Sequence, residues 1–242
     1  MTGATVLAGI GAFGHRVITR IEQSLSDPEG RVQLLARPAP GDVVTGVHQA
    51  LEALLEAGRY RATSTGQRLD LFLFANAAVL DGDALLETCA DLGDLVQAQY
   101  GAMFDLRLPP EQRTAALHVV LWTPALTDSP ESREVLGRLL RLQSWFERPE
   151  TRIRGNLLAR VWLMPQVGKA GQLKAEGLIA SATAFALATV GSGLREQERI
   201  RELLRHPPVD AGRFALLTVA SLTVPEAAVR DYAIQRAIYD GL

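Results

Sequence analysis

Short apolar runs alternate along the chain with longer segments in which apolar residues recur every three or four positions. The runs are rich in Val, Leu, Ile and Phe with little polar alternation, which is typical of strands that helices cover on both faces. They occupy residues 5–10, 31–36, 69–75, 116–122, 157–164 and 214–222. This alternation predicts an α/β fold with a mostly parallel sheet and helices on both faces, a three-layer sandwich of Rossmann-like type.

The segments between the runs have the apolar spacing of amphipathic helices. One of these helices is expected to begin at Ser129, with Pro130 at its first helical position. Its expected buried residues are Val135, Leu136, Leu139, Leu140 and Trp145. Pro225 is expected to open a last helix in the same way.

Length and composition are those of an ordinary globular protein. The chain has 242 residues, 48% hydrophobic and 21% charged, and no break in the pattern is long enough to be a linker between domains. We therefore expect residues 1–242 to form a single domain. The apolar stretch 178–190 is shorter than the roughly 20 residues that cross a bilayer, so a buried helix is expected there and no membrane partner.

Charge and cysteine content argue against several classes of function. Lys and Arg number 25 against 27 Asp and Glu, so no excess of positive charge indicates nucleic-acid binding. Cys89 is the only cysteine, which rules out an intrachain disulfide and a thiolate metal centre and fits a reducing, cytoplasmic location. The four histidines lack metal-ligand spacing and no serine lies in a G-x-S-x-G motif, so neither a metal nor nucleophilic catalysis is expected.

A glycine-rich turn follows the first expected strand, where Gly9, Gly11 and Gly14 have G-x-G-x-x-G spacing. Glycines at such a turn let phosphate oxygens approach backbone N–H groups at a helix N-terminus. A nucleotide site is therefore expected at Gly9, Gly11, Ala12, Phe13 and Gly14. The alternative is structural, because any α/β fold needs small residues where its first helix packs on the sheet.

A dinucleotide-binding fold presents an acidic residue near the end of its second strand, which binds the ribose hydroxyls. This chain has Arg37 at that position. Because an arginine can accommodate a ribose phosphate, an NAD(P)-binding oxidoreductase of Rossmann type is one candidate function.

Asn76 and Ala77 lie at the tip after the third expected strand, on the carboxyl edge of the sheet where ligands of such folds bind. Both residues are therefore expected to contact the nucleotide, with the alternative that the Asn76 side chain only closes the turn. Asp81 and Asp83 follow, either as magnesium ligands or as caps of a helix from Ala84, and capping is the preferred interpretation.

Three segments resemble the bacterial tubulin-like proteins, which are distant relatives of tubulin and FtsZ. VLAGIGAFGHRVITRI, residues 6–21, is similar to the opening strand and glycine turn of that family. Residues 157–190 follow its order of strand, turn and long helix, and residues 214–242 resemble its closing strand and helix. The resemblance implies a tubulin-like sandwich, GTP or GDP at the Gly9 turn, and self-association or other protein subunits as partners in a bacterial assembly.

The chain departs from that family at one loop. Tubulin and FtsZ hold the phosphates with a second loop of the type GGGTG, whereas residues 74–78 here read Phe-Ala-Asn-Ala-Ala. Alanine side chains hinder the close approach of a phosphate to the backbone. Since no acidic catalytic loop is found either, the resemblance implies a scaffold or assembly protein with a degenerate guanine-nucleotide pocket rather than an active GTPase.

Overall fold

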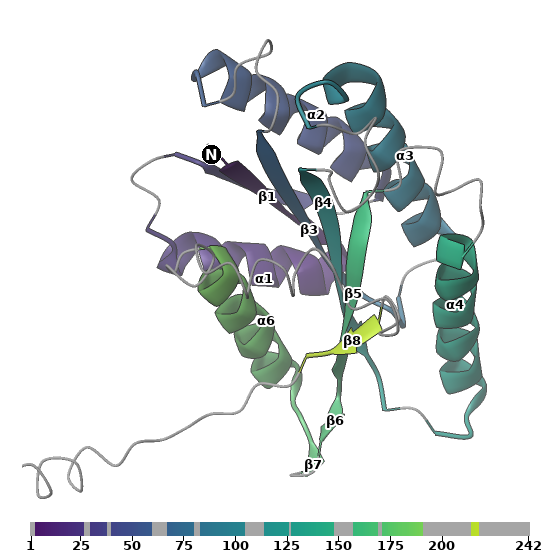
Figure 1. Cartoon of the computed structure of the whole chain (residues 1–242). Coiled ribbons are helices and arrows are strands. Elements are labelled where there is room, and N and C mark those ends of the chain that lie inside the picture. Colours follow the sequence, from purple (N-terminus) through teal and green to yellow (C-terminus); the bar gives the residue numbers. More distant parts are fainter. Residues whose placement is uncertain are drawn as a thin grey trace, which may run out of the picture.

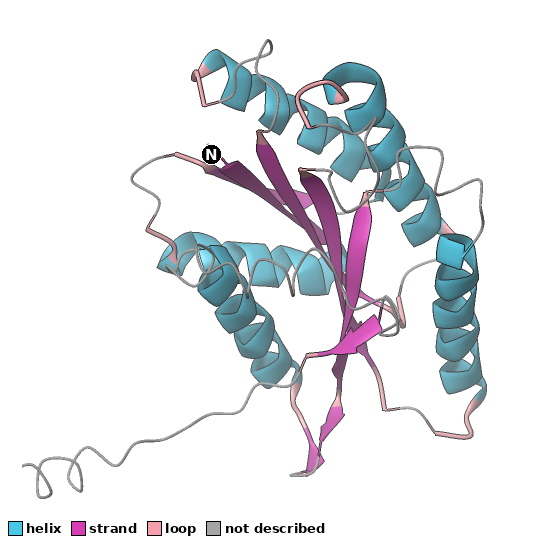
Figure 2. Ribbon diagram, viewed as in Figure 1, coloured by secondary structure: helices cyan, strands magenta, loops and turns pink. Residues whose placement is uncertain are grey.

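The computed structural model describes residues 3–26, 30–37, 40–59, 67–79, 83–104, 114–125, 127–147, 157–168, 171–190 and 214–217. Six parallel strands form the main sheet, in the order β2-β1-β3-β4-β5-β8. Helices cover both faces of this sheet (Figure 1), and Figure 2 shows the strands as a central magenta layer. The predicted α/β class, with a parallel sheet in a three-layer sandwich, is confirmed.

Strands form where the apolar runs predict them. Their bounds are β1 Gly3–Ile10, β2 Val32–Arg37, β3 Arg68–Asn76, β4 Ala115–Thr123, β5 Leu158–Pro165 and β8 Phe214–Leu216. β3 and β4 are buried over almost their whole length because they occupy the centre of a sheet that is covered on both faces. Of the run expected at 214–222, the first residues form β8, and residues 218–222 lie outside the described part.

The described helices divide into two layers. They are α1 Gly11–Ser24, α2 Pro40–Glu56, α3 Ala84–Tyr100, α4 Pro130–Glu147 and α6 Ala175–Val190. Because successive side chains of a strand point to opposite faces, Phe72 and Phe74 pack with α1 and α6, whereas Leu71 and Leu73 pack with α2 and α3. The sheet therefore separates two hydrophobic cores.

The start of α4 and the position of α6 agree with the sequence pattern. Ser129 Oγ accepts a hydrogen bond from the backbone N–H of Ser132 at 3.2 Å and so caps α4 as predicted. The helix expected at 178–190 is confirmed in α6, where Leu178 is buried. The helix expected from Pro225 lies outside the described residues. In the described ranges, no helix combines the length and apolarity that crossing a membrane requires.

The face that α4 buries agrees with the prediction only in part. Val135 is buried as predicted, at 2% exposure, and Leu139 is partly buried against the core. Leu136 and Leu140 are 47% and 56% exposed, so the prediction is wrong for these two, and Leu142, which the pattern did not single out, is buried at 2% exposure. Val135 and Leu142 lie two turns apart on the same side of the helix. Successive side chains of a helix are rotated by about 100°, so Leu136, directly after Val135, points away from the core.

A short antiparallel hairpin joins β5 to α6. Its strands are β6 Val167–Gly168 and β7 Gly171–Gln172. The hairpin extends beyond the carboxyl edge of the main sheet (Figure 1). The hydrophobic pattern does not predict it, because strands of two residues are too short to show a period of two.

Candidate functional site

The strand order brings the glycine turn and the tip of β3 to one place. β1 lies between β2 and β3, and the helices that follow β1 and β3 cover opposite faces of the sheet. In open α/β sheets, ligands bind outside the carboxyl ends of the strands where the order reverses in this way. Gly9 is the register partner of Phe74, two residues before Asn76. The predicted site residues of both segments therefore meet at this switch point.

Gly11 makes the turn from β1 into α1. Ile10 ends β1 with an extended backbone, at a φ of −108° and a ψ of 127°, and Gly11 then has a φ of +66°. A residue with a Cβ atom is strained at such a φ, so this turn requires glycine. A Cβ added to Gly11 would meet no atom within 4 Å. The space beside the turn is therefore open.

Gly9 and Gly14 are explained by packing. A Cβ at Gly9 would lie 2.3 Å from the carbonyl carbon of Gly14, and a Cβ at Gly14 would lie 2.4 Å from the carbonyl oxygen of Phe74. Neither distance is sterically possible without a backbone shift. The structural interpretation of the motif thus accounts for these two glycines, whereas Gly11 faces open space.

The start of α1 has the electrostatic character of an anion site. No side chain caps the helix, and its first turn contains no acidic residue. The N–H groups of a first turn have no partner within the helix, and the helix dipole adds partial positive charge there. Ala12 is exposed, whereas the ring of Phe13 is buried and packs against Trp122 with the ring centroids 5.4 Å apart. Phe13 can thus offer a ligand its backbone N–H but not its side chain.

The loop after β3 uses its own N–H groups internally. Ala77 N–H donates to the carbonyl oxygen of Trp122 at 2.9 Å, and Val79 N–H donates to that of Asn76 at 3.2 Å. Asn76 Oδ1 accepts from the N–H of Ala78 at 2.9 Å, which is the turn-closing geometry that was the alternative interpretation of this residue. The loop therefore presents no row of free N–H groups like the one that cradles a phosphate.

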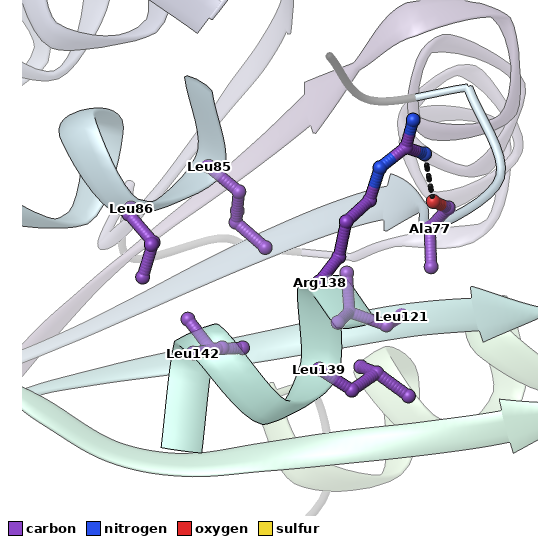
Figure 3. A pocket seen from close by; sticks show the side chains of 7 residues that line it. All are labelled: Ala77, Leu85, Leu86, Leu121, Arg138, Leu139 and Leu142. Carbon is purple, nitrogen blue, oxygen red and sulfur yellow. Dashed lines mark hydrogen bonds between the residues drawn. The ribbon is translucent and has the colours of Figure 1, made fainter. Parts of the chain in front are cut away.

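Arg138 of α4 holds the same loop by its carbonyl oxygens (Figure 3). Its Nη1 donates to Ala77 O at 2.8 Å and to Ala78 O at 3.2 Å, while its Nη2 pairs with Glu134. A cavity of about 20 Å³ lies beside this contact, room for about one water molecule and too little for a nucleotide. The cavity is lined by Ala77, Leu85, Leu86, Leu121, Arg138, Leu139 and Leu142.

Sequence reasoning did not single out Arg138. The one local signal is its i,i+4 spacing from Glu134, which predicts a pair on an exposed helix face. Its contact with Ala77 joins residues 61 positions apart, and only the packing of α4 against α3 and β4, next to the turn after β3, decides it.

Basic side chains of α1 lie beside α6. Arg16 and Arg20 both pair with Glu176 in the first turn of α6, Arg20 at 3.8 Å, and all three side chains are about half exposed. Side chains of a helix lean toward its N-terminus. Arg16, five residues after Gly11, is therefore the first arginine that can reach an anion at the turn.

Asp83, at the start of α3, pairs with an arginine of α4. Asp83 occupies the N-cap position of α3 as predicted, but its side chain makes no capping hydrogen bond. Instead, its Oδ1 lies 3.4 Å from Nε of Arg141. Asp81 lies outside the described residues. Where the structure describes the chain, no three or more His, Cys, Asp or Glu residues gather closely enough to hold a metal ion.

The titratable groups of α2 and α3 lie on the other side of the sheet. Cys89 is buried in α3, and burial raises the pKa of its thiol to about 12, so the thiol stays protonated. His48 Nδ1 lies 3.1 Å from the hydroxyl of Tyr100, whose pKa is raised by burial and, secondarily, by Glu52. Tyr100 ends α3 toward the amino edge of the sheet, so this group is remote from Gly11.

The end of β2 also adjoins the glycine turn. The backbone of Arg37 is the register partner of Ile10. The sheet of the dinucleotide fold has the strand order 3-2-1-4-5-6, so its third strand lies on the outer side of its second strand. Among the described residues no strand lies beyond β2, and the order 2-1-3-4-5 matches the other common doubly wound arrangement.

A scan against protein-family models finds no match to this chain, and searches of curated proteins and of solved structures find none either.

Proposed function

We propose that this chain is a tubulin-like assembly subunit of the bacterial cytoplasm that binds the phosphates of a guanine nucleotide at the start of α1, without relying on GTP hydrolysis. The observation that carries the nucleotide part is Gly11, which opens an uncapped helix at the switch point of the sheet and faces open space. The resemblance of residues 6–21, 157–190 and 214–242 to the tubulin-like family supports the assembly part.

The phosphates would accept hydrogen bonds from the first-turn N–H groups of α1. Two side chains are candidates for further donors. Asn76 can add its Nδ2 group, because its Oδ1 is already used within the loop. Arg16 can add a guanidinium that its half-exposed pair with Glu176 leaves accessible.

The affinity is expected to be weak compared with a pocket that has a GGGTG-type loop. The N–H groups of Ala77, Ala78 and Val79 are already bonded within the protein, so they are not offered to a phosphate. Each hydrogen bond to a charged group contributes about 1.5–3 kcal/mol. The absence of even two such bonds from this loop to a phosphate therefore lowers the affinity by roughly two to four orders of magnitude.

The proposal is tested by titrating the protein with GDP and GTP and following thermal unfolding, with ADP as control. Nucleotide at one hundred times its Kd adds about 2.7 kcal/mol to the free energy of unfolding, which is easily detected. Light scattering at high micromolar protein, with and without nucleotide, tests assembly. Failure to bind either guanine nucleotide at millimolar concentration contradicts the nucleotide part, and a strictly monomeric protein contradicts the assembly part.

A Rossmann-type oxidoreductase that binds NAD(P) at the same turn is the second candidate. The register of Arg37 with Ile10 favours it, because a ribose phosphate would lie beside that strand end. The strand order counts against this candidate, since the dinucleotide fold has a strand beyond β2 and none lies there among the described residues. Tighter binding of NADPH than of GTP in the same titration would reverse this ranking.

A further inference from the structure

A buried arginine on β5 has two donor atoms without a hydrogen-bonding partner. Arg160 is 7% exposed, and its Nε and Nη2 atoms are both buried without a hydrogen bond. Its guanidinium lies 5.3 Å from the ring centroid of Trp162, two residues along the same strand. No carboxylate pairs with Arg160 in the described part of the chain. Two buried donors of a charged group are unfavourable unless an acceptor binds to them.

The groups around Arg160 are donors and aromatic rings. The indole Nε1 of Trp162 is buried and likewise has no acceptor among the described residues, and Phe185 of α6 packs on that ring at 5.1 Å. His118 of β4 is the register partner of Arg160 and is 1% exposed. Asp70 is a buried carboxylate on β3, but β4 lies between β3 and β5. Burial lowers the pKa of the Arg160 guanidinium.

The two unpaired atoms of Arg160 belong to one edge of the guanidinium. Nε–H and Nη2–H on that edge point the same way and can give two parallel hydrogen bonds to two oxygens of one anion, as in bidentate binding of carboxylate or phosphate. We propose that Arg160 and the indole N–H of Trp162 form a binding site for a small oxyanion on the face of the sheet that α1 and α6 cover. The site takes a small anion because a side chain buried to this extent is out of reach of a folded partner's surface.

This site is separate from the proposed nucleotide site. Arg160 lies near the amino end of β5, whereas α1 starts at the carboxyl edge of the sheet. The two sites can therefore be tested independently, since a substitution of Arg160 leaves the Gly11 turn in place.

The test compares thermal unfolding of the full chain and of Arg160→Met in phosphate, sulfate and acetate against chloride at equal ionic strength. The wild type is expected to show a saturable rise in Tm with at least one oxyanion, and the variant none of that rise. In chloride, the variant is expected to melt at the wild-type temperature or above, because an unpaired buried charge is gone. An equal rise in both proteins, or a wild-type response no larger than in chloride, overturns the proposal.

Conservative variants separate binding from a general loss of packing. Arg160→Lys keeps the positive charge but removes the pair of parallel donors, Nε–H and Nη2–H. It is expected to weaken anion affinity at least about tenfold. Trp162→Phe removes one N–H donor and is expected to weaken it as well. Trp122→Phe is the matched control, because its indole Nε1 is also buried without a partner in the described residues but lies outside the site. Equal weakening by Trp122→Phe overturns the role of Trp162.

The chain itself could supply the oxyanion, and one further variant decides this. Asp210 precedes β8, the strand beside β5, by four residues in the sequence. If Asp210→Asn responds to oxyanions and the wild type does not, and if Asp210→Asn and Arg160→Met are not additive in stability, a carboxylate of the chain occupies the site and the proposal is overturned. A rise in Tm with oxyanion that is as large in Asp210→Asn as in the wild type supports binding of a free anion.

Discussion

Gly9 and Gly14 touch through their backbones where β1 passes into α1. A Cβ built on Gly9 would lie 2.3 Å from the carbonyl oxygen of Gly14, and one built on Gly14 would lie 2.6 Å from the Cα of Gly9. This close approach lets α1 start immediately after the strand and aim its first turn at the edge of the sheet. The packing of these two glycines thereby positions the open Gly11 between them.

Replacing Gly14 by Ala is expected to destabilise the protein. The new Cβ would collide with Gly9 and with the carbonyl oxygen of Phe74, and these are backbone atoms that cannot move aside easily. Overpacking of this kind costs about 1–3 kcal/mol, occasionally more. The free energy of unfolding in a urea titration measures the effect.

Gly137→Ala is the matched control for that substitution. Gly137 lies in the interior of α4, and a Cβ there would meet nothing within 4 Å. Replacing a helical glycine by Ala stabilises by roughly 0.5–1 kcal/mol, so the two variants should shift stability in opposite directions. A Gly14→Ala protein as stable as the wild type would show that the β1–α1 contact is looser than described.

Gly11→Ala is expected to reduce nucleotide affinity at least about tenfold, because loss of one charge-assisted hydrogen bond suffices for that. Gly58→Ala provides the comparison, since Gly58 has a φ of +68° and open space around it, as Gly11 has with +66°. Both substitutions should cost about 1–2 kcal/mol of stability through the left-handed backbone alone. Calorimetric titration with GDP then distinguishes the two variants, because only Gly11→Ala should lose affinity. Equal affinity for GDP in both variants contradicts binding at the α1 turn.

Arg138→Lys is expected to loosen the loop after β3. Lysine cannot bond the carbonyl oxygens of Ala77 and Ala78 and the Glu134 carboxylate together in the geometry of a guanidinium. Amide hydrogen exchange at Ala78 should accelerate about tenfold or more, which corresponds to one lost hydrogen bond to a charged group. Arg141→Lys affects only the exposed pair with Asp83 and should leave that exchange rate unchanged. Uniformly faster exchange along the chain would indicate global destabilisation instead.

Stability is expected to fall between pH 9 and pH 12 because of Cys89. Burial raises the pKa of its thiol from 9.0 to about 12, so the unfolded chain loses this proton first as the pH rises. The stabilisation is complete below pH 9 and disappears as the pH rises through the folded pKa, at about 1.4 kcal/mol per pH unit within the window. The contribution of the thiol is the difference between the free energies of urea unfolding of the wild type and of Cys89→Ala across this pH range. Tyr100 titrates in both proteins, so its contribution cancels in the difference. Parallel curves for the two proteins would contradict a buried, protonated thiol.

The main strands, the helices between them and their order along the chain could be predicted from the sequence, whereas the β6–β7 hairpin could not. An unbroken apolar run such as residues 69–75 is compatible with one environment, a strand covered on both faces, and β3 forms there. The cap at Ser129 is equally local, because its hydroxyl bonds a backbone N–H three residues away. Gly11 could be recognised as a turn residue from its position after the first strand, since the required φ is a property of the local backbone.

The tertiary structure decided everything that depends on which surfaces meet. The position of β1 between β2 and β3 joins the Gly11 turn to Asn76, and no local pattern encodes that order. Leu136 faces solvent because α4 buries the Val135 stripe, although the helical period allows either choice. Arg138 reaches Ala77 across 61 residues for the same reason. Hydrophobic periodicity indicates whether a segment forms a helix or a strand. Long-range packing determines which elements become its neighbours, and these neighbours determine which side chains meet at the edge of the sheet.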